Sequence, residues 1–150
     1  MLTHYNLISS LGGIRCSDPA FYNSESRGVF FAPLCHIYGK LSASIYSTLL
    51  IALGLNTVGL MGVWLGSYTM LMRQYKLDGL LKLSAEAKAN TLRIVPPIAL
   101  AMTKNDTFGS YDLSGIKFIM CSGAALQTSV IRALQKKFNG APIFQGYGYV

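Results

Sequence analysis

Residues 111–126, YDLSGIKFIMCSGAAL, decide the fold of this chain. The apolar run 117–121 (KFIMC) predicts a buried strand, and the small residues after it predict a tight turn. A helix is expected next over residues 127–138, because apolar side chains recur there at helical spacing: Val130, Ile131, Leu134 and Phe138. A strand followed closely by a helix is half of a βαβ unit.

The same alternation runs through the rest of the chain. Strands are expected at residues 28–35, 66–72, 91–95 and 142–145, and helices at 3–15, 41–53, 77–87 and 98–103. Thr3 is a plausible N-cap of the first helix, and residues 104–110 are rich in turn formers. Strands separated by helices indicate the α/β class, with a parallel sheet built from βαβ units.

Composition narrows the possible functions. The net charge is +7, but the basic residues are scattered, and the one cluster, Arg132, Lys136 and Lys137, has no interleaved aromatic residue. We therefore interpret the cluster as a solvated helix face and expect no nucleic-acid partner. Three widely spaced cysteines, Cys16, Cys35 and Cys121, form no metal or redox pattern and are expected to be reduced, partly buried thiols of an intracellular protein.

Residues 41–72 contain no charged side chain. A run of this length can span a bilayer, since about 20 apolar residues suffice. It also contains eight Ser, Thr and Asn residues and four glycines, which suit a buried helix followed by a buried strand equally well. Hydropathy alone leaves both interpretations open.

Candidate site residues follow the predicted strands, because ligands of parallel sheets bind beyond the carboxyl ends of the strands. His36 is a candidate acid, base or pocket-lining donor, or a hydrogen-bonded structural histidine. The small residues 122–125 allow a flat ligand to approach the backbone, or simply form a tight turn. Residues 145–148 (QGYG) suit a loop that stacks on a ring, or an ordinary glycine turn.

Five segments together resemble one family. They are MLTH-x-N (1–6), APLCHIYG (32–39), RIVPPIALAM (93–102), YDLSGIKFIMCSGAAL (111–126) and IFQGYG (143–148). In this order they resemble the adenylate-forming enzymes, and especially 4-coumarate–CoA ligase-like and related acyl- or aryl-CoA ligases. The resemblance covers nearly the whole chain. It implies that residues 1–150 are an internal fragment of the large N-terminal domain, a partial AMP-dependent synthetase/ligase domain.

The resemblance also implies a chemistry. Such ligases join a carboxylic acid to ATP with Mg²⁺, release pyrophosphate, and pass the acyl group from the adenylate to CoA, in the cytoplasm or the peroxisome. By position, the substrate-binding residues would be His36, Tyr38 and Gly123. The nucleotide-binding residues would be Ala124, Ala125, Gln145, Gly146, Tyr147 and Gly148. No catalytic residue or metal ligand is assigned.

The sequence departs from the family pattern at several places. The family's phosphate loop precedes the MLTH block, and no counterpart stands in these 150 residues. Val150 falls where the family has a threonine, and the following metal-binding glutamate and the small C-terminal domain have no counterpart. Extra residues are expected within 51–64. We therefore expect no ligase activity from this chain alone. The alternatives are a membrane-associated or interaction fragment using residues 41–72, and a partial module with residual adenylate affinity.

Overall fold

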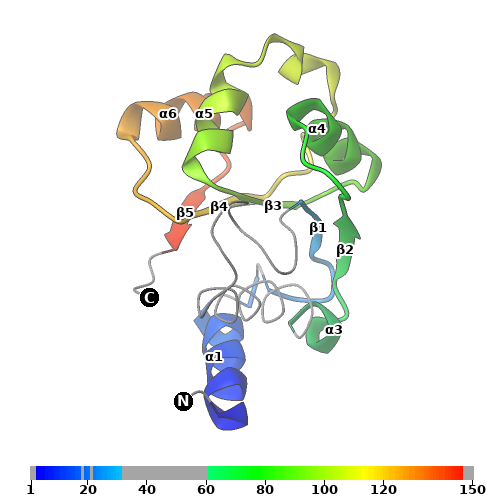
Figure 1. Cartoon of the computed structure of the whole chain (residues 1–150), viewed down its shortest axis with the longest axis vertical. Coiled ribbons are helices and arrows are strands. Elements are labelled where there is room, and N and C mark those ends of the chain that lie inside the picture. Colours follow the sequence, from blue (N-terminus) through cyan, green and yellow to red (C-terminus); the bar gives the residue numbers. More distant parts are fainter. Residues whose placement is uncertain (1–2, 18, 21, 32–60, 147–150) are drawn as a thin grey trace, which may run out of the picture.

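The computed structural model describes residues 3–17, 19–20, 22–31 and 61–146. Five parallel strands form the middle layer of the molecule, with one group of helices above them and another below (Figure 1). The chain is therefore α/β with parallel strands, as the sequence predicts.

The strands form two hydrogen-bonded groups that lie side by side. The first pairs β1 (Arg27–Phe30) with β2 (Tyr68–Leu71). The second has the order β3 (Thr91–Ile94), β4 (Phe118–Ser122) and β5 (Ile143–Gly146). Because β1 lies beside β3, the strands follow one another across the layer in the order β2, β1, β3, β4, β5 (Figure 1).

The junction between β1 and β3 depends on Asn90. Its side-chain oxygen accepts the backbone N–H of Arg27 at 2.8 Å, and its amide nitrogen donates to the carbonyl of Glu25 at 2.8 Å. Its own backbone N–H donates to the Arg27 carbonyl at 2.9 Å. Gly28 permits this close approach, since a Cβ there would lie 2.9 Å from Thr91 Oγ1. Asn90 and Gly28 thus join the two groups of strands into one layer.

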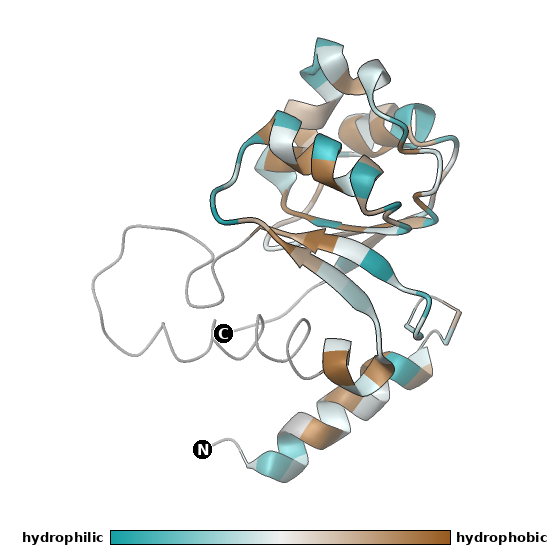
Figure 2. Cartoon of the chain, turned by 90° about the vertical axis from the view of Figure 1, so that its right-hand side faces the viewer, coloured by the Kyte–Doolittle hydropathy of each residue, from teal (hydrophilic) through white to brown (hydrophobic). Residues whose placement is uncertain are grey.

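Three helices cover one face of the strands: α4 (Leu77–Glu86), α5 (Pro96–Lys104) and α6 (Thr128–Lys137) (Figure 1). Alternate strand residues, such as Leu92, Ile119 and Cys121, point into the core that these helices close, together with Leu81, Met102 and Leu134. Burying each of the larger aliphatic side chains contributes about 1.5–3 kcal/mol. Figure 2 shows the apolar sides of these helices turned toward the strands.

Two local features fix the ends of α5. Val95 is extended, as a residue before proline prefers, and Pro96 begins the helix, where a missing N–H costs nothing. At the other end, the Lys137 ammonium donates to the carbonyls of Met102 at 2.9 Å and Asn105 at 3.0 Å.

The interpretation of the basic cluster as a solvated helix face is therefore wrong for Lys137, while Arg132 and Lys136 are exposed.

The second group of helices lies on the opposite side of the strands (Figure 1). The helix α1 (His4–Ser17) begins as predicted, because the Asn6 N–H donates to Thr3 Oγ1 at 3.3 Å. It packs through Leu11 against Met61 and Leu65 of the short helix α3 (Met61–Leu65), which the sequence did not predict. A 3₁₀ helix, η2 (Asp106–Ser110), occupies the predicted turn.

Several predictions change or lie outside the described part. The helix predicted at 41–53 and the end of the strand predicted at 28–35 lie outside the described residues. Cys121 is buried, but Cys16 is exposed, contrary to expectation, and Cys35 lies outside the described residues. In the described ranges no helix is long and apolar enough to cross a membrane. Residues 61–72, the described part of the uncharged run, form α3 and β2 instead of a span.

Replacement of Asn90 tests the β1–β3 junction. We expect Asn90→Ala to lower the free energy of unfolding by about 1–2 kcal/mol, because two backbone groups lose their partners. Asn90→Asp keeps the acceptor for Arg27 and should cost less. Urea unfolding followed by circular dichroism measures both, with exposed Gln74→Ala as the control. Equal stability of Asn90→Ala and the control would contradict this role.

Candidate functional site

The carboxyl ends of β3, β4 and β5 meet at one edge of the strand layer. The parallel register pairs Ile94 with Cys121, Cys121 with Gln145, and Ser122 with Gly146. The segments that follow β4 and β5 therefore start side by side, although more than twenty residues separate them in the sequence. Ligands of parallel sheets bind at such edges.

The β4–α6 turn (residues 123–126) begins with three small residues. Gly123 has φ +101°, a conformation that side chains rarely adopt, and Ala124 and Ala125 are exposed. Gly146 lies against the start of this turn, since a Cβ there would be 3.4 Å from the Ser122 Cβ. Backbone groups are thus accessible at the edge, with only methyl groups or hydrogens around them.

A direct hydrogen bond joins the two segments. The backbone N–H of Leu126 donates to Gln145 Oε1 at 2.8 Å. Leu126 is itself buried in the main core, so the turn is held at its end by packing and by this bond. Of the predicted site residues, the structure brings Gly123, Ala124, Ala125, Gln145 and Gly146 together.

The other predicted site residues cannot be placed. His36, Tyr38, Tyr147 and Gly148 lie outside the described residues. Cys121, which ends next to the turn, is fully buried, and burial raises the pKa of its thiol, so it suits packing better than reactivity. Within the described ranges no three His, Cys, Asp or Glu side chains gather as metal ligands.

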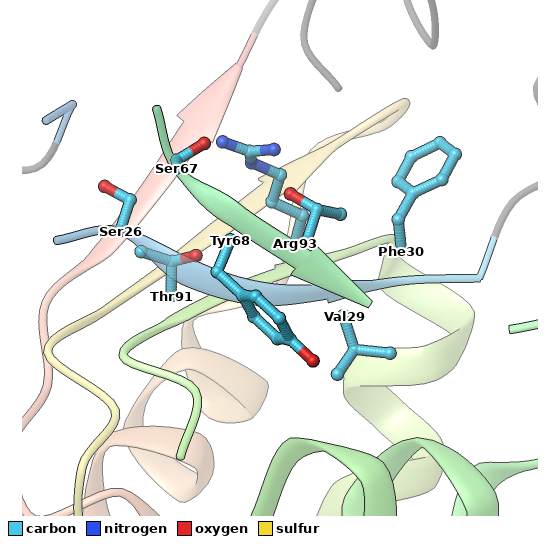
Figure 3. A pocket seen from close by; sticks show the side chains of 9 residues that line it. Ser26, Val29, Phe30, Ser67, Tyr68, Thr91 and Arg93 are labelled. Atoms are coloured by element: carbon cyan, nitrogen blue, oxygen red, sulfur yellow. The ribbon is translucent and has the colours of Figure 1, made fainter. Parts of the chain in front are cut away.

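A second polar site, which the sequence did not indicate, lies elsewhere on the strands. It is a cavity of about 10 Å³, room for roughly one water molecule. The polar residues and the glycine that line it belong to or directly precede β1, β2 and β3: Ser26, Gly28, Ser67, Thr69, Thr91 and Arg93. In Figure 3, Arg93 and Ser67 lie on the opposite side of the strands from Val29 and Tyr68. The lining extends from the amino ends of the strands to Phe30, the last residue of β1. None of the residues 121–126 and 145–146 at the carboxyl edge of β4 and β5 belongs to it.

Arg93 is the unusual member of this cavity. Burial lowers the pKa of its guanidinium, and the nearby Tyr22 opposes that shift. Over the part of the chain that the structure describes, its guanidinium makes no hydrogen bond or ion pair. The only sequence signal for it is a charged residue inside the short apolar run of β3, where it alternates with the buried residues Leu92 and Ile94.

Comparison with known proteins identifies the family. The family model for "AMP-binding enzyme" matches residues 1–149. The chain belongs to the AMP-binding enzyme family. Among its relatives, a 4-coumarate–CoA ligase of Pinus taeda is 33% identical over 150 residues, and 4-coumarate–CoA ligase 3 of Arabidopsis thaliana is 29% identical. The match covers 99% of this chain but only 25% and 24% of these two relatives. The chain thus corresponds to a fragment of an AMP-binding enzyme.

Two solved structures from Mycobacterium tuberculosis share its fold. A Mycobacterium tuberculosis fatty acyl CoA synthetase superposes with a TM-score of 0.77 at 18% identity, over 99% of this chain and 26% of that one. The N-terminal domain of FACL13 from the same bacterium superposes with a TM-score of 0.75 at 18% identity, over 99% and 33% of the two chains. At this identity the likeness concerns the fold.

The described part of the chain does not support the alternative that residues 41–72 associate with a membrane. The helices found in the described ranges are too short or too polar to span a bilayer, and residues 61–72 form part of the folded domain. The first twenty residues of the uncharged run lie outside the described part. In the described stretch of this run, Met61 and Leu65 are buried beside α1 and Met70 lies against the main core, while Val63, Trp64, Tyr68 and Leu71 are exposed.

Replacement of Arg93 tests how its burial beside the polar cavity affects the stability of the protein. We expect Arg93→Met to raise the free energy of unfolding by about 1 kcal/mol, because it keeps the aliphatic stem and removes a desolvated charge to which the described residues offer no acceptor. Urea unfolding measures the effect.

Arg27→Met is the matched control. Arg27 Nε donates to the Ala87 carbonyl at 2.9 Å, and its guanidinium lies 4.8 Å from the centre of the Tyr68 ring. Its loss should destabilise the protein by about 1 kcal/mol. An Arg93→Met protein as destabilised as Arg27→Met would show that Arg93 does have a stabilising partner.

Proposed function

We propose that this chain forms one wall of the adenylate and acyl pocket of an acyl- or aryl-CoA ligase. In this proposal the β4–α6 turn and the end of β5 face the bound acyl adenylate. The chain does not complete the reaction by itself. The observation that carries the proposal is the direct contact between these two segments, through the Ser122–Gly146 register pair and the 2.8 Å bond from Leu126 to Gln145.

The shape of this edge suits a flat ligand. Gly123, Ala124, Ala125 and Gly146 have no side chain beyond Cβ, so a planar ring can reach the backbone. The main-chain N–H and C=O groups of the exposed turn then serve as the hydrogen-bonding partners of the ring. By position, Gly123 would border the acyl group, and the remaining residues would border the nucleotide.

The family's cofactors are ATP, Mg²⁺ and CoA. Bound ATP supplies the adenylyl group that activates the carboxylic acid. The described residues suit the adenylate side of such a ligand but offer no cluster of carboxylates or imidazoles to hold Mg²⁺. The phosphates and the metal ion would therefore depend on groups other than the described residues.

Because the described residues suit the adenylate but not the phosphates or the metal ion, we expect this chain alone to have no ligase activity. Electrostatic stabilisation of developing charge is usually the largest contribution to catalysis. Among the described residues, those at the carboxyl ends of β4 and β5 (121–122 and 145–146) and those of the β4–α6 turn include no lysine, arginine or acidic side chain. The turn can orient an adenylate, but it cannot neutralise the phosphate charge that builds up when pyrophosphate leaves.

ATP–pyrophosphate exchange over a panel of aliphatic and aromatic carboxylic acids tests the proposed inactivity. We expect no exchange above background from the purified 150-residue chain. The positive control is the complete Pinus taeda ligase assayed with 4-coumarate. Clear exchange with any acid of the panel would contradict the proposal that this chain cannot form an adenylate alone.

A further inference from the structure

The side chain of Gln145 makes a contact that its position in the QGYG segment does not reveal. Its amide oxygen accepts the N–H of Leu126, nineteen residues earlier in the chain. Because the donor is a backbone N–H, the acceptor must be the oxygen of the amide group. The orientation of the Gln145 amide is therefore fixed by the turn that it contacts.

The β4–α6 turn has few other restraints. Gly123, Ala124 and Ala125 lack side chains that could anchor them, and all three are exposed. At its start the turn continues from Ser122, which pairs with Gly146 of β5. At its end it is held by burial of the Leu126 side chain and by the bond to Gln145. Two consecutive residues of β5 thus hold both ends of the turn.

The length of the Gln145 side chain matters for this contact. Gln145 pairs with Cys121 in the register, so its backbone lies one residue before the end of β4. Its side chain must reach past Ser122 and the following turn to meet Leu126. Asparagine has one methylene less, while glutamate has the same reach and keeps an oxygen acceptor.

We propose that Gln145 is a positioning residue of the adenylate site, acting through the β4–α6 turn. Its amide oxygen holds the turn in the shape that receives the adenosine part of the ligand, and its side chain makes no essential contact with the nucleotide. This inference rests on the proposed function and assigns to Gln145 an indirect role in it.

Two substitutions separate positioning from direct contact. Gln145→Glu keeps the acceptor oxygen and loses the amide N–H₂ donors. Gln145→Met keeps the approximate length and loses both. A positioning role requires that Gln145→Glu behave like the unmodified chain and that Gln145→Met not do so. Direct contact through the N–H₂ group requires that both variants fail equally.

Hydrogen exchange in the ligand-free chain tests the bond itself. We expect the protection of the Leu126 amide to fall by about tenfold in Gln145→Met and to be retained in Gln145→Glu. The Ile119 amide, which donates to the Pro142 carbonyl at 2.9 Å, is the internal control and should change in neither variant. Unchanged protection of Leu126 in Gln145→Met would overturn the proposal.

Calorimetric titration with adenosine tests the consequence for binding. Adenosine is uncharged, so the carboxylate of Gln145→Glu does not repel it. We expect about tenfold weaker binding by Gln145→Met and binding within about threefold of the unmodified chain by Gln145→Glu. Equal loss in both variants, with Leu126 still protected in Gln145→Glu, would overturn the positioning role.

The two measurements also distinguish this proposal from the proposed function. If the unmodified chain binds no adenosine, the proposed function fails, and with it the positioning role. The exchange result would then still report whether the bond between Gln145 and Leu126 forms. If adenosine binds and only the Leu126 protection fails to respond, the positioning role alone is wrong.

Discussion

The parallel pairing of β4 with β5 is the constraint on which the candidate site depends. It places Ser122 beside Gly146, and it brings Gln145 within reach of Leu126. Parallel strands need a crossover, here α6, whose Val130 and Leu134 are buried against the same core. Packing of the helix thus fixes the strand register, and the register fixes the distance between the two segments that form the site.

The two faces of the strands differ in how completely they are covered. The face toward α4, α5 and α6 is filled by aliphatic side chains, with Leu80, Met102 and Leu134 fully buried. The other face carries Thr91 and Arg93 (Figure 3). By the register through Met120, it also carries Phe144, whose side chain is 38% exposed.

Sequence patterns predicted the order of the elements, because each strand or helix carries its own periodicity. They predicted β4, α6 and the positions of residues 122–125 and 145–148 at the ends of two strands. They could not predict contacts between distant residues. The Asn90 junction, the bonds from Lys137 to the end of α5, and the burial of Arg93 all arise from tertiary packing. The short helix α3 escaped prediction because five residues contain too little periodicity.

The central claim is that the β4–α6 turn and the end of β5 together receive an adenylate. Mapping of backbone amide chemical shifts during a titration with AMP tests it most directly. The account predicts saturable shifts at Gly123, Ala124, Ala125 and Gly146, with little change around Arg93 and the polar cavity that it lines. Saturable shifts centred on Arg93 and its neighbours, with none at the β4–α6 turn, would contradict it.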